Sequence, residues 1–148
     1  MSKGKGVVGL LGVIVAVLVA GCGSSGSDST ITTAEFTKQA GAICKEAEEK
    51  RVEGLAAIAE QAPPSADVEA QQEKAIRQVM PTYEEAAEQI DKLGAPKGEE
   101  QKVEALVEAM EEAAEKATAD PHTAAVSNIF FRKADQLAEP YNLTGCII

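Results

Sequence analysis

Aromatic residues and histidine are scarce in this chain, and their scarcity excludes several kinds of protein. The sequence has no tryptophan, phenylalanine and tyrosine together make up 3% of 148 residues, and His122 is the single histidine. A di-iron bundle needs two Glu-x-x-His motifs, so one histidine excludes that arrangement. Covalent haem attachment through C-x-x-C-H is excluded because the motif is missing. The few aromatics predict a thin core, although 45% hydrophobic residues exclude a wholly disordered chain.

Motifs that carry out catalysis are missing as well. The sequence has no G-x-S-x-G motif and no glycine-rich loop that could hold a phosphate. His122 has no predicted nucleophile or orienting carboxylate, so we interpret it as an ordinary surface residue. A haem iron held between His122 and Met80 or Met110 is the alternative. We therefore expect a protein that is not an enzyme, with no catalytic residues, no metal ligands and no cofactor.

Basic residues are outnumbered by acidic ones. The chain has 14 Lys and Arg against 24 Asp and Glu, which gives a formal net charge of −10. Such a protein is repelled by phosphate backbones, so nucleic acid is not an expected partner. Glu100, Glu104, Glu108 and Glu112 recur at every fourth position, on one face of an expected helix. We interpret this acidic face as a solvated surface; a weak cation-binding ridge and a docking surface for a basic partner are the alternatives.

Residues 1–21 have the features of a secretory signal peptide. Lys3 and Lys5 precede the uncharged apolar run from Gly6 to Gly21. A helix that spans a bilayer needs about 20 apolar residues, and this run is shorter. A basic start, a short apolar run and small residues at the end are typical of a cleaved signal. An uncleaved membrane anchor is the alternative.

The end of this run resembles the lipobox of bacterial lipoproteins, which reads here Leu18-Val19-Ala20-Gly21-Cys22. The resemblance implies cleavage before Cys22, a diacylglycerol on its thiol, and acylation of the new N-terminus with fatty acids such as palmitate. Two or three acyl chains anchor a protein stably where one does not. Residues 22–31 are rich in Gly and Ser and predict a flexible tether. We therefore expect residues 32–148 to form a domain on the outer face of the cell membrane.

The apolar periodicity of residues 32–148 predicts an all-α domain of four helices. The first runs from the capping box Thr32-x-x-Glu35 to Pro63-Pro64, and the second from its expected N-cap Ser65 to Gly94. The third covers about 98–119, and the fourth runs from Asp120 to Pro140. Short loops favour an antiparallel up-down-up-down bundle. Pro81 is expected to kink the second helix, with a division after Val79 as the alternative.

The apolar positions of each helix predict the core. The second helix is expected to turn Val68 and Val79 inward. In the fourth helix, Val126, Ile129 and Phe130 are expected inward together with Ala134 and Leu137. Phe131 follows Phe130 directly, and two consecutive helical positions cannot both point to the core. Phe131 is therefore expected at the edge.

Two cysteines remain for the folded domain once Cys22 carries lipid. Cys44 lies in the third turn of the first helix, and Cys146 lies beyond the fourth. An even number of antiparallel helices returns the chain to the end where the first helix begins, so these residues are expected to meet. We predict a Cys44–Cys146 disulfide, which suits an exported protein with a thin core. Two buried free thiols are the alternative.

The sequences around these cysteines resemble small uncharacterised lipoproteins of high-GC Gram-positive bacteria. The resemblance rests on Phe36-x-x-x-Ala40-x-x-Ile43-Cys44 and on Tyr141-x-Leu143-x-x-Cys146. Asn142 stands where similar proteins often have glycine, and asparagine tolerates a left-handed backbone. The resemblance implies a cell-envelope location and paired cysteines, and it carries no known activity.

These expectations together predict a lipoprotein tethered to the membrane by its N-terminal lipid. Its helical domain is expected to bind or scaffold something, either an envelope protein or a small ligand. The alternative function is a small-ligand carrier that uses the bundle interior near Pro81.

Overall fold

The computed structural model describes residues 30–63 and 65–146, and all regular secondary structure in these ranges is helical. This confirms the all-α class. The predicted signal peptide, Cys22 and the tether up to residue 29 lie outside the described residues. Within the described ranges, no helix combines the length and the apolar character needed to cross a bilayer.

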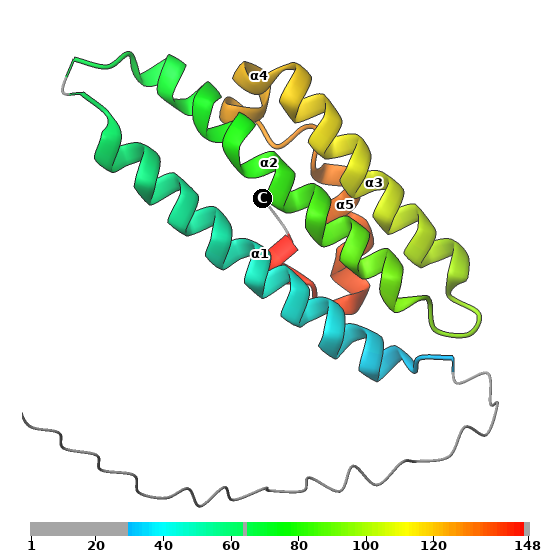
Figure 1. Ribbon diagram of the computed structural model, residues 1–148. Coiled ribbons are helices and arrows are strands. Elements are labelled where there is room, and N and C mark those ends of the chain that lie inside the picture. Colours follow the sequence, from blue (N-terminus) through cyan, green and yellow to red (C-terminus); the bar gives the residue numbers. More distant parts are fainter. Residues whose placement is uncertain (1–29, 64, 147–148) are drawn as a thin grey trace, which may run out of the picture.

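Three long helices form the frame of the molecule: α1 (Thr33–Gln61), α2 (Val68–Leu93) and α3 (Glu100–Ala119). Two short α-helices follow, α4 (Pro121–Val126) and α5 (Arg132–Ala138), and then the 3₁₀ helices η1 (Glu139–Tyr141) and η2 (Thr144–Cys146). α2 lies between α1 and α3, and each long helix runs opposite to the one before it (Figure 1). The C-terminal segment contacts α3 through α5 and α1 through η2, so it joins the two outer helices.

The helix ends follow local rules, with one correction. Thr32 and Glu35 form the predicted capping box, and α1 ends at Gln61, just before Pro63. The predicted cap Ser65 is wrong, because the Asp67 carboxylate accepts the Glu69 N–H at 2.9 Å and caps α2 instead. Ala66 N–H donates to the Pro63 carbonyl at 2.9 Å, so a turn occupies the segment where the cap was expected.

Pro81 does not divide α2, which is continuous from Val68 to Leu93. Val79, Met80 and Tyr83 are all buried, whereas Pro81 itself is exposed. The apolar stripe therefore keeps its phase across the proline, and packing of that stripe holds the helix together despite the missing N–H.

The single fourth helix predicted from Asp120 to Pro140 is wrong. Its start is confirmed, because the Asp120 carboxylate accepts the Thr123 N–H at 3.0 Å and Pro121 takes the first helical position. The helix ends at Val126, and a turn follows in which the Ser127 hydroxyl accepts the Ile129 N–H at 3.2 Å. Serine competes with a helix by such local hydrogen bonds. A new helix, α5, begins at Arg132.

This break resets which residues face the core. Val126 and Ile129 are 67% and 49% exposed, so their predicted inward positions are wrong. Phe131, expected at the edge, is fully buried and packs edge-to-face on Tyr83, whereas Phe130 is only partly buried. The helical phase counted from Asp120 no longer applies after the turn, which is the physical reason for the errors at Ile129, Phe130 and Phe131. Val126 is the last residue of α4 and is exposed before the turn begins.

The predicted Cys44–Cys146 disulfide is confirmed. Its two Cα atoms lie 4.7 Å apart, and the residues are 102 positions apart in sequence. Two local features bring η2 onto α1. Asn142 adopts the left-handed conformation that was expected of it, with φ of 53°. A Cβ on Gly145 would lie 2.8 Å from the Cys44 carbonyl oxygen, so only glycine fits this contact with the backbone of α1.

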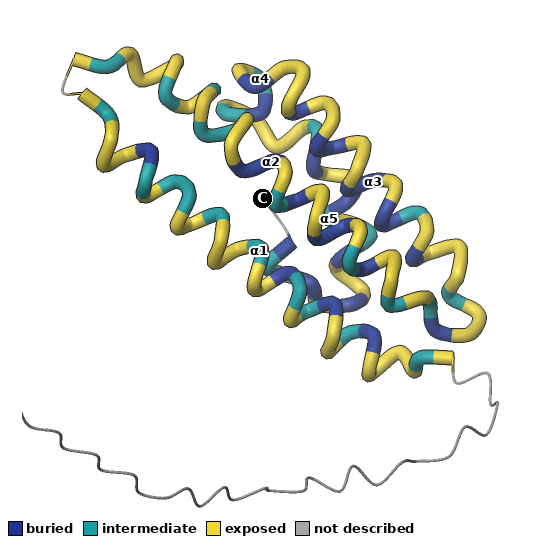
Figure 2. The backbone as a smooth tube through the Cα atoms, in the orientation of Figure 1, coloured by how far each residue is buried: buried dark blue, intermediate teal, exposed yellow. Residues whose placement is uncertain are grey.

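The core occupies one half of the α1–α2 pair. Buried residues of α1 are Phe36, Ala40 and Cys44 near its start, and then only Ile58. Those of α2 begin at Val79 and continue to Ile90. The other half, where α1 ends and α2 begins, is mostly exposed or half-buried (Figure 2). We call this half, residues 52–75, the distal hairpin.

Candidate functional site

An apolar groove runs between the two helices of the distal hairpin. It is a wide depression of about 400 Å³ that is open to solvent. α1 contributes Leu55, Ile58 and Ala59 to the lining, and α2 contributes Val68, Gln71 and Ala75. We call these residues the hairpin groove.

The groove accounts for the exposure of Val68, an apolar residue that the sequence analysis predicted to face the core. Val68 was expected inward, and it is 71% exposed at the mouth of the groove. α1 and α2 lie side by side, and α4 packs on another side of the start of α2 (Figure 1). Among the described residues, only those of α1, α2 and the loop between them line the groove. The apolar periodicity of α2 therefore continues beyond the part of the helix that has a core to face.

The bundle interior near Pro81 offers far less space. The void lined by Val79, Thr82 and Tyr83, with Ala47 and Gly145 opposite, has a volume of about 10 Å³. That is about the space that one water molecule needs. A carrier of small molecules would therefore need a ligand site other than this void, and the hairpin groove is larger than the void.

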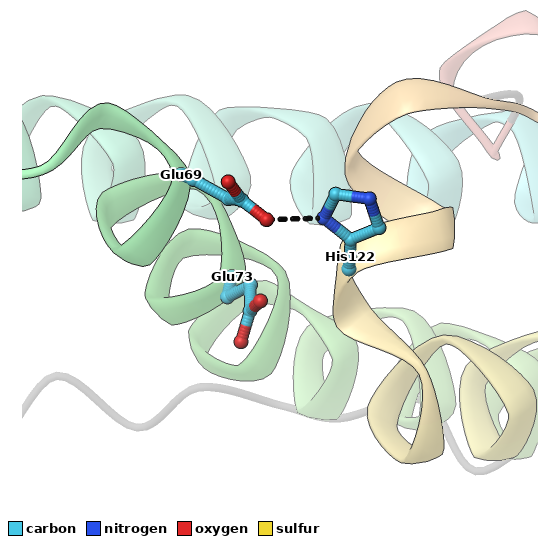
Figure 3. A group of neighbouring side chains, drawn as sticks. All are labelled: Glu69, Glu73 and His122. Atoms are coloured by element: carbon cyan, nitrogen blue, oxygen red, sulfur yellow. Dashed lines mark ion pairs between the residues drawn. The ribbon is translucent and has the colours of Figure 1, made fainter.

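A second feature lies on another side of the same turns of α2. Glu69 and Glu73 project from α2 toward His122 at the start of α4 (Figure 3). His122 Nδ1 lies 2.9 Å from Glu69 Oε1, and one ligand atom from each of the three residues lies within 4.8 Å of the others. We call Glu69, Glu73 and His122 the histidine cluster.

Sequence reasoning missed this cluster. It treated His122 as a surface residue without a carboxylate partner, and the residue is indeed exposed, but the structure places two carboxylates beside it. The i, i+4 spacing of Glu69 and Glu73 on one helical face was visible in the sequence. The approach of α4 to α2 was not, because these helices are separated by the whole of α3.

The acidic face of α3 is partly compensated by neighbouring cations. Lys116 Nζ donates to Glu112 Oε1, and Lys133 of α5 lies 3.7 Å from the other oxygen. The hydrogen bond from Lys116 and the charges of both lysines lower the pKa of Glu112. Glu100 accepts the Gly98 N–H at 2.9 Å, which lowers its pKa. These contacts account for part of the acidic face without a bound cation.

A carboxylate network joins three segments near the start of α1. Glu99 accepts hydrogen bonds from the Tyr141 hydroxyl at 2.7 Å and from the Thr33 hydroxyl at 2.8 Å. These bonds lower the pKa of Glu99. The network therefore stabilises the fold at pH values above the ordinary pKa of a glutamate, and this stabilisation is lost as the pH falls through the lowered pKa. Burial, and then the bond to Glu99, raises the pKa of Tyr141 to about 12.

A second tyrosine is buried against a carboxylate. Tyr83 is 5% exposed, and neither its hydroxyl nor Asp135 Oδ1 has a hydrogen-bond partner within the described residues. Burial, and then the nearby charge of Asp135, raises the pKa of Tyr83 far above its ordinary value. Burial likewise raises the pKa of Asp135.

These two tyrosines predict an alkaline transition that one absorbance can follow. Tyr83 and Tyr141 are the only tyrosines in the chain. In the unfolded chain both ionise near pH ~10, whereas the folded protein keeps them protonated. Stability is thus fully present below pH ~10 and falls as the pH rises toward 12. We expect absorbance at 295 nm to rise together with loss of helical circular dichroism.

Glu99→Gln provides the matched test of the Tyr141 assignment. It removes the charge that disfavours the tyrosinate, so one of the two tyrosines is expected to ionise at lower pH than in the wild type. Glu104→Gln, at an exposed position of α3, serves as the control and is expected to leave both curves unchanged. Ionisation of both tyrosines near pH 10 in the folded wild type would contradict the prediction.

Comparisons with protein families, with curated proteins and with solved structures give no match to this chain.

Proposed function

We propose that this chain is a lipid-anchored, extracytoplasmic binding protein without catalytic activity, whose hairpin groove receives an apolar part of a ligand or of an envelope protein. The observation that carries the binding role is the groove of about 400 Å³ between α1 and α2, which is lined mainly by aliphatic side chains. Its apolar lining supports the proposal, because ligand sites are lined mainly by apolar side chains.

In sequence the proposed anchor precedes α1, whereas the groove is lined by residues near the end of α1. The lipobox-like sequence ends at Cys22, ten or so residues before α1 begins at Thr33. With 29 residues, α1 has a length of roughly 40 Å. A protein tethered through Cys22 would therefore present its groove away from the lipid, where a soluble ligand or an envelope partner can reach it.

The small-ligand carrier is the second candidate function, and the same groove favours it over the bundle interior. In this version the ligand is a small, mainly apolar molecule that occupies the groove by itself. A scaffold would instead insert an apolar side chain or helix of a partner protein. The two versions differ in what copurifies with the protein.

One mass-spectrometry experiment tests the anchor and the groove together. The full-length protein is extracted from membranes of its own host in mild detergent. We expect a denatured mass that lacks residues 1–21 and includes acyl chains on Cys22. We expect a native mass that is higher by a noncovalent ligand or partner. A denatured mass equal to the unprocessed chain would overturn the anchor.

Paired variants of α1 test the groove. Ala59→Glu places a charge within the groove, and we expect it to abolish copurification of the ligand or partner. Ala56→Glu makes the same change at an exposed position of α1 that does not line the groove, and it should leave binding unchanged. Equal binding by both variants, or no bound species in repeated wild-type preparations, would contradict the binding role.

The topology of the bundle and the shape of α2 are also part of the proposal. We propose that α1, α2, α3 and the broken C-terminal segment correspond to an up-down-up-down bundle, and that α2 is kinked at Pro81. The alternating directions of the three long helices support the first statement (Figure 1). A proline inside α2 supports the second.

A further inference from the structure

The histidine cluster brings together donors of two kinds from two separate helices. Glu69 and Glu73 offer carboxylate oxygens from successive turns of α2, and His122 offers an imidazole nitrogen from α4 (Figure 3). A cluster of carboxylates alone would suit calcium or magnesium. The imidazole changes this preference, because it is a ligand for zinc, copper, nickel and iron.

The spacing of the donors is close to that of a metal site. All three ligand atoms lie within 4.8 Å of one another. Zinc–nitrogen and zinc–oxygen bonds are about 2.0–2.2 Å long, so two ligand atoms on a tetrahedral ion lie roughly 3.4 Å apart. His122 Nδ1 and Glu69 Oε1, now 2.9 Å apart, need to separate slightly, and the Glu73 carboxylate needs to move closer to them. Glu69 and His122 have side chains that are 63% and 54% exposed, so they are free to make this adjustment.

The backbone positions of the donors are set by contacts in which the donors take no part. Pro121 and Ala124 of α4 are buried, although α4 has only six residues. The segment before α4 is held by Arg77 of α2, whose guanidinium donates to the Thr118 carbonyl at 2.9 Å. His122 is therefore carried to Glu69 and Glu73 by the packing of α4 on α2, which preorganises the cluster.

We propose that Glu69, Glu73 and His122 bind a divalent transition-metal ion of the zinc type, and that the ion fastens α4 to α2. The two carboxylates balance the charge of the ion, and water completes the coordination. The ion replaces the contact between His122 and Glu69 with bonds to all three side chains. Since a six-residue helix is marginal by itself, α4 is the element that such a bond stabilises most.

The single histidine makes the test sharp. The full-length protein is purified without a histidine tag, so every imidazole signal in a ¹⁵N spectrum comes from His122. We expect ZnCl₂ to bind with one tight site per chain, to shift the imidazole ¹⁵N resonances, and to slow amide hydrogen exchange in α4. CaCl₂ is expected to produce none of the three effects at equal concentration.

Three variants separate the cluster from the general acidity of the chain. His122→Gln and Glu73→Gln are each expected to weaken zinc binding about tenfold or more. Glu73→Gln leaves the contact between His122 and Glu69 intact, so it removes a ligand without loosening α4. Glu84→Gln, at an exposed position of α2 outside the cluster, is expected to bind zinc as the wild type does.

Three results would overturn the proposal. The first is zinc affinity that is unchanged in both His122→Gln and Glu73→Gln, which would assign the ion to other acidic residues. The second is an imidazole spectrum that does not respond to zinc at saturation. Loss of binding in Glu84→Gln to the same extent as in Glu73→Gln would count against the cluster in the same way, because it would reflect net charge alone.

Discussion

Removal of the Cys44–Cys146 disulfide is expected to lower the free energy of unfolding by about 4–5 kcal/mol, the value of the chain-entropy model for a loop of about 100 residues. The two cysteines are 102 positions apart, so the bond restricts nearly the whole folded domain. Both cysteines are buried, and each lies within the main core. The core is poor in aromatics, so little other stabilisation is available to compensate.

The measurement is guanidinium denaturation of the full-length protein, followed by circular dichroism. The Cys44→Ala/Cys146→Ala variant is compared with the wild type, each with and without reductant. Reductant should shift the wild-type midpoint strongly and leave the double variant unchanged. Cys22→Ala is the matched control, because it removes a cysteine and keeps the bond. Wild-type midpoints that agree with and without reductant would refute the prediction.

Phe131→Ala is expected to cost about 3–5 kcal/mol, as is usual for a buried phenylalanine. Phe131 is fully buried, and its ring centroid lies 5.7 Å from that of Tyr83 in an edge-to-face arrangement. The cavity left by the substitution lies between α2 and the turn before α5. The substitution also removes the aromatic partner of Tyr83, whose hydroxyl is buried without a hydrogen bond within the described residues.

Phe130→Ala is the control for this measurement. Phe130 is only partly buried at the edge of the core, so its truncation should cost clearly less than that of Phe131. Denaturation curves of the two variants therefore decide whether Phe131 or Phe130 is the aromatic residue buried in the core. A larger loss for Phe130→Ala would contradict the burial of Phe131 and favour the inward position of Phe130 that periodicity predicts.

Local signals predicted the three long helices well. The capping box at Thr32, the stop before Pro63 and the glycine at position 94 depend on neighbours in sequence, so they could be identified without a fold. The disulfide was also predicted, from the cysteine count and the expected return of the chain to the start of the first helix, and the pairing is confirmed. In the structure the contact spans 102 positions and depends on the backbone turn at Asn142 and on Gly145, after a C-terminal segment that is not the predicted single helix.

The C-terminal segment was less predictable because two local tendencies compete there. Apolar periodicity favours a continuous helix through Ile129 and Phe130, whereas Ser127 and Asn128 favour a turn. The balance is decided by burial of Phe131 against Tyr83, a contact between residues 48 positions apart in sequence. No pattern within the segment contains that contact.

The candidate site shows the same division. The sequence by itself determined which side chains are available: the single His122, the pair Glu69 and Glu73, and the aliphatic residues of the distal hairpin. Only the tertiary structure decided that α4 brings His122 to those carboxylates, and that within residues 30–63 and 65–146 the hairpin groove is lined by α1, α2 and their loop alone. The physical reason is that helix formation depends on residues a few positions apart. Which helical faces meet, and which stay uncovered, depends instead on packing between segments far apart in the chain.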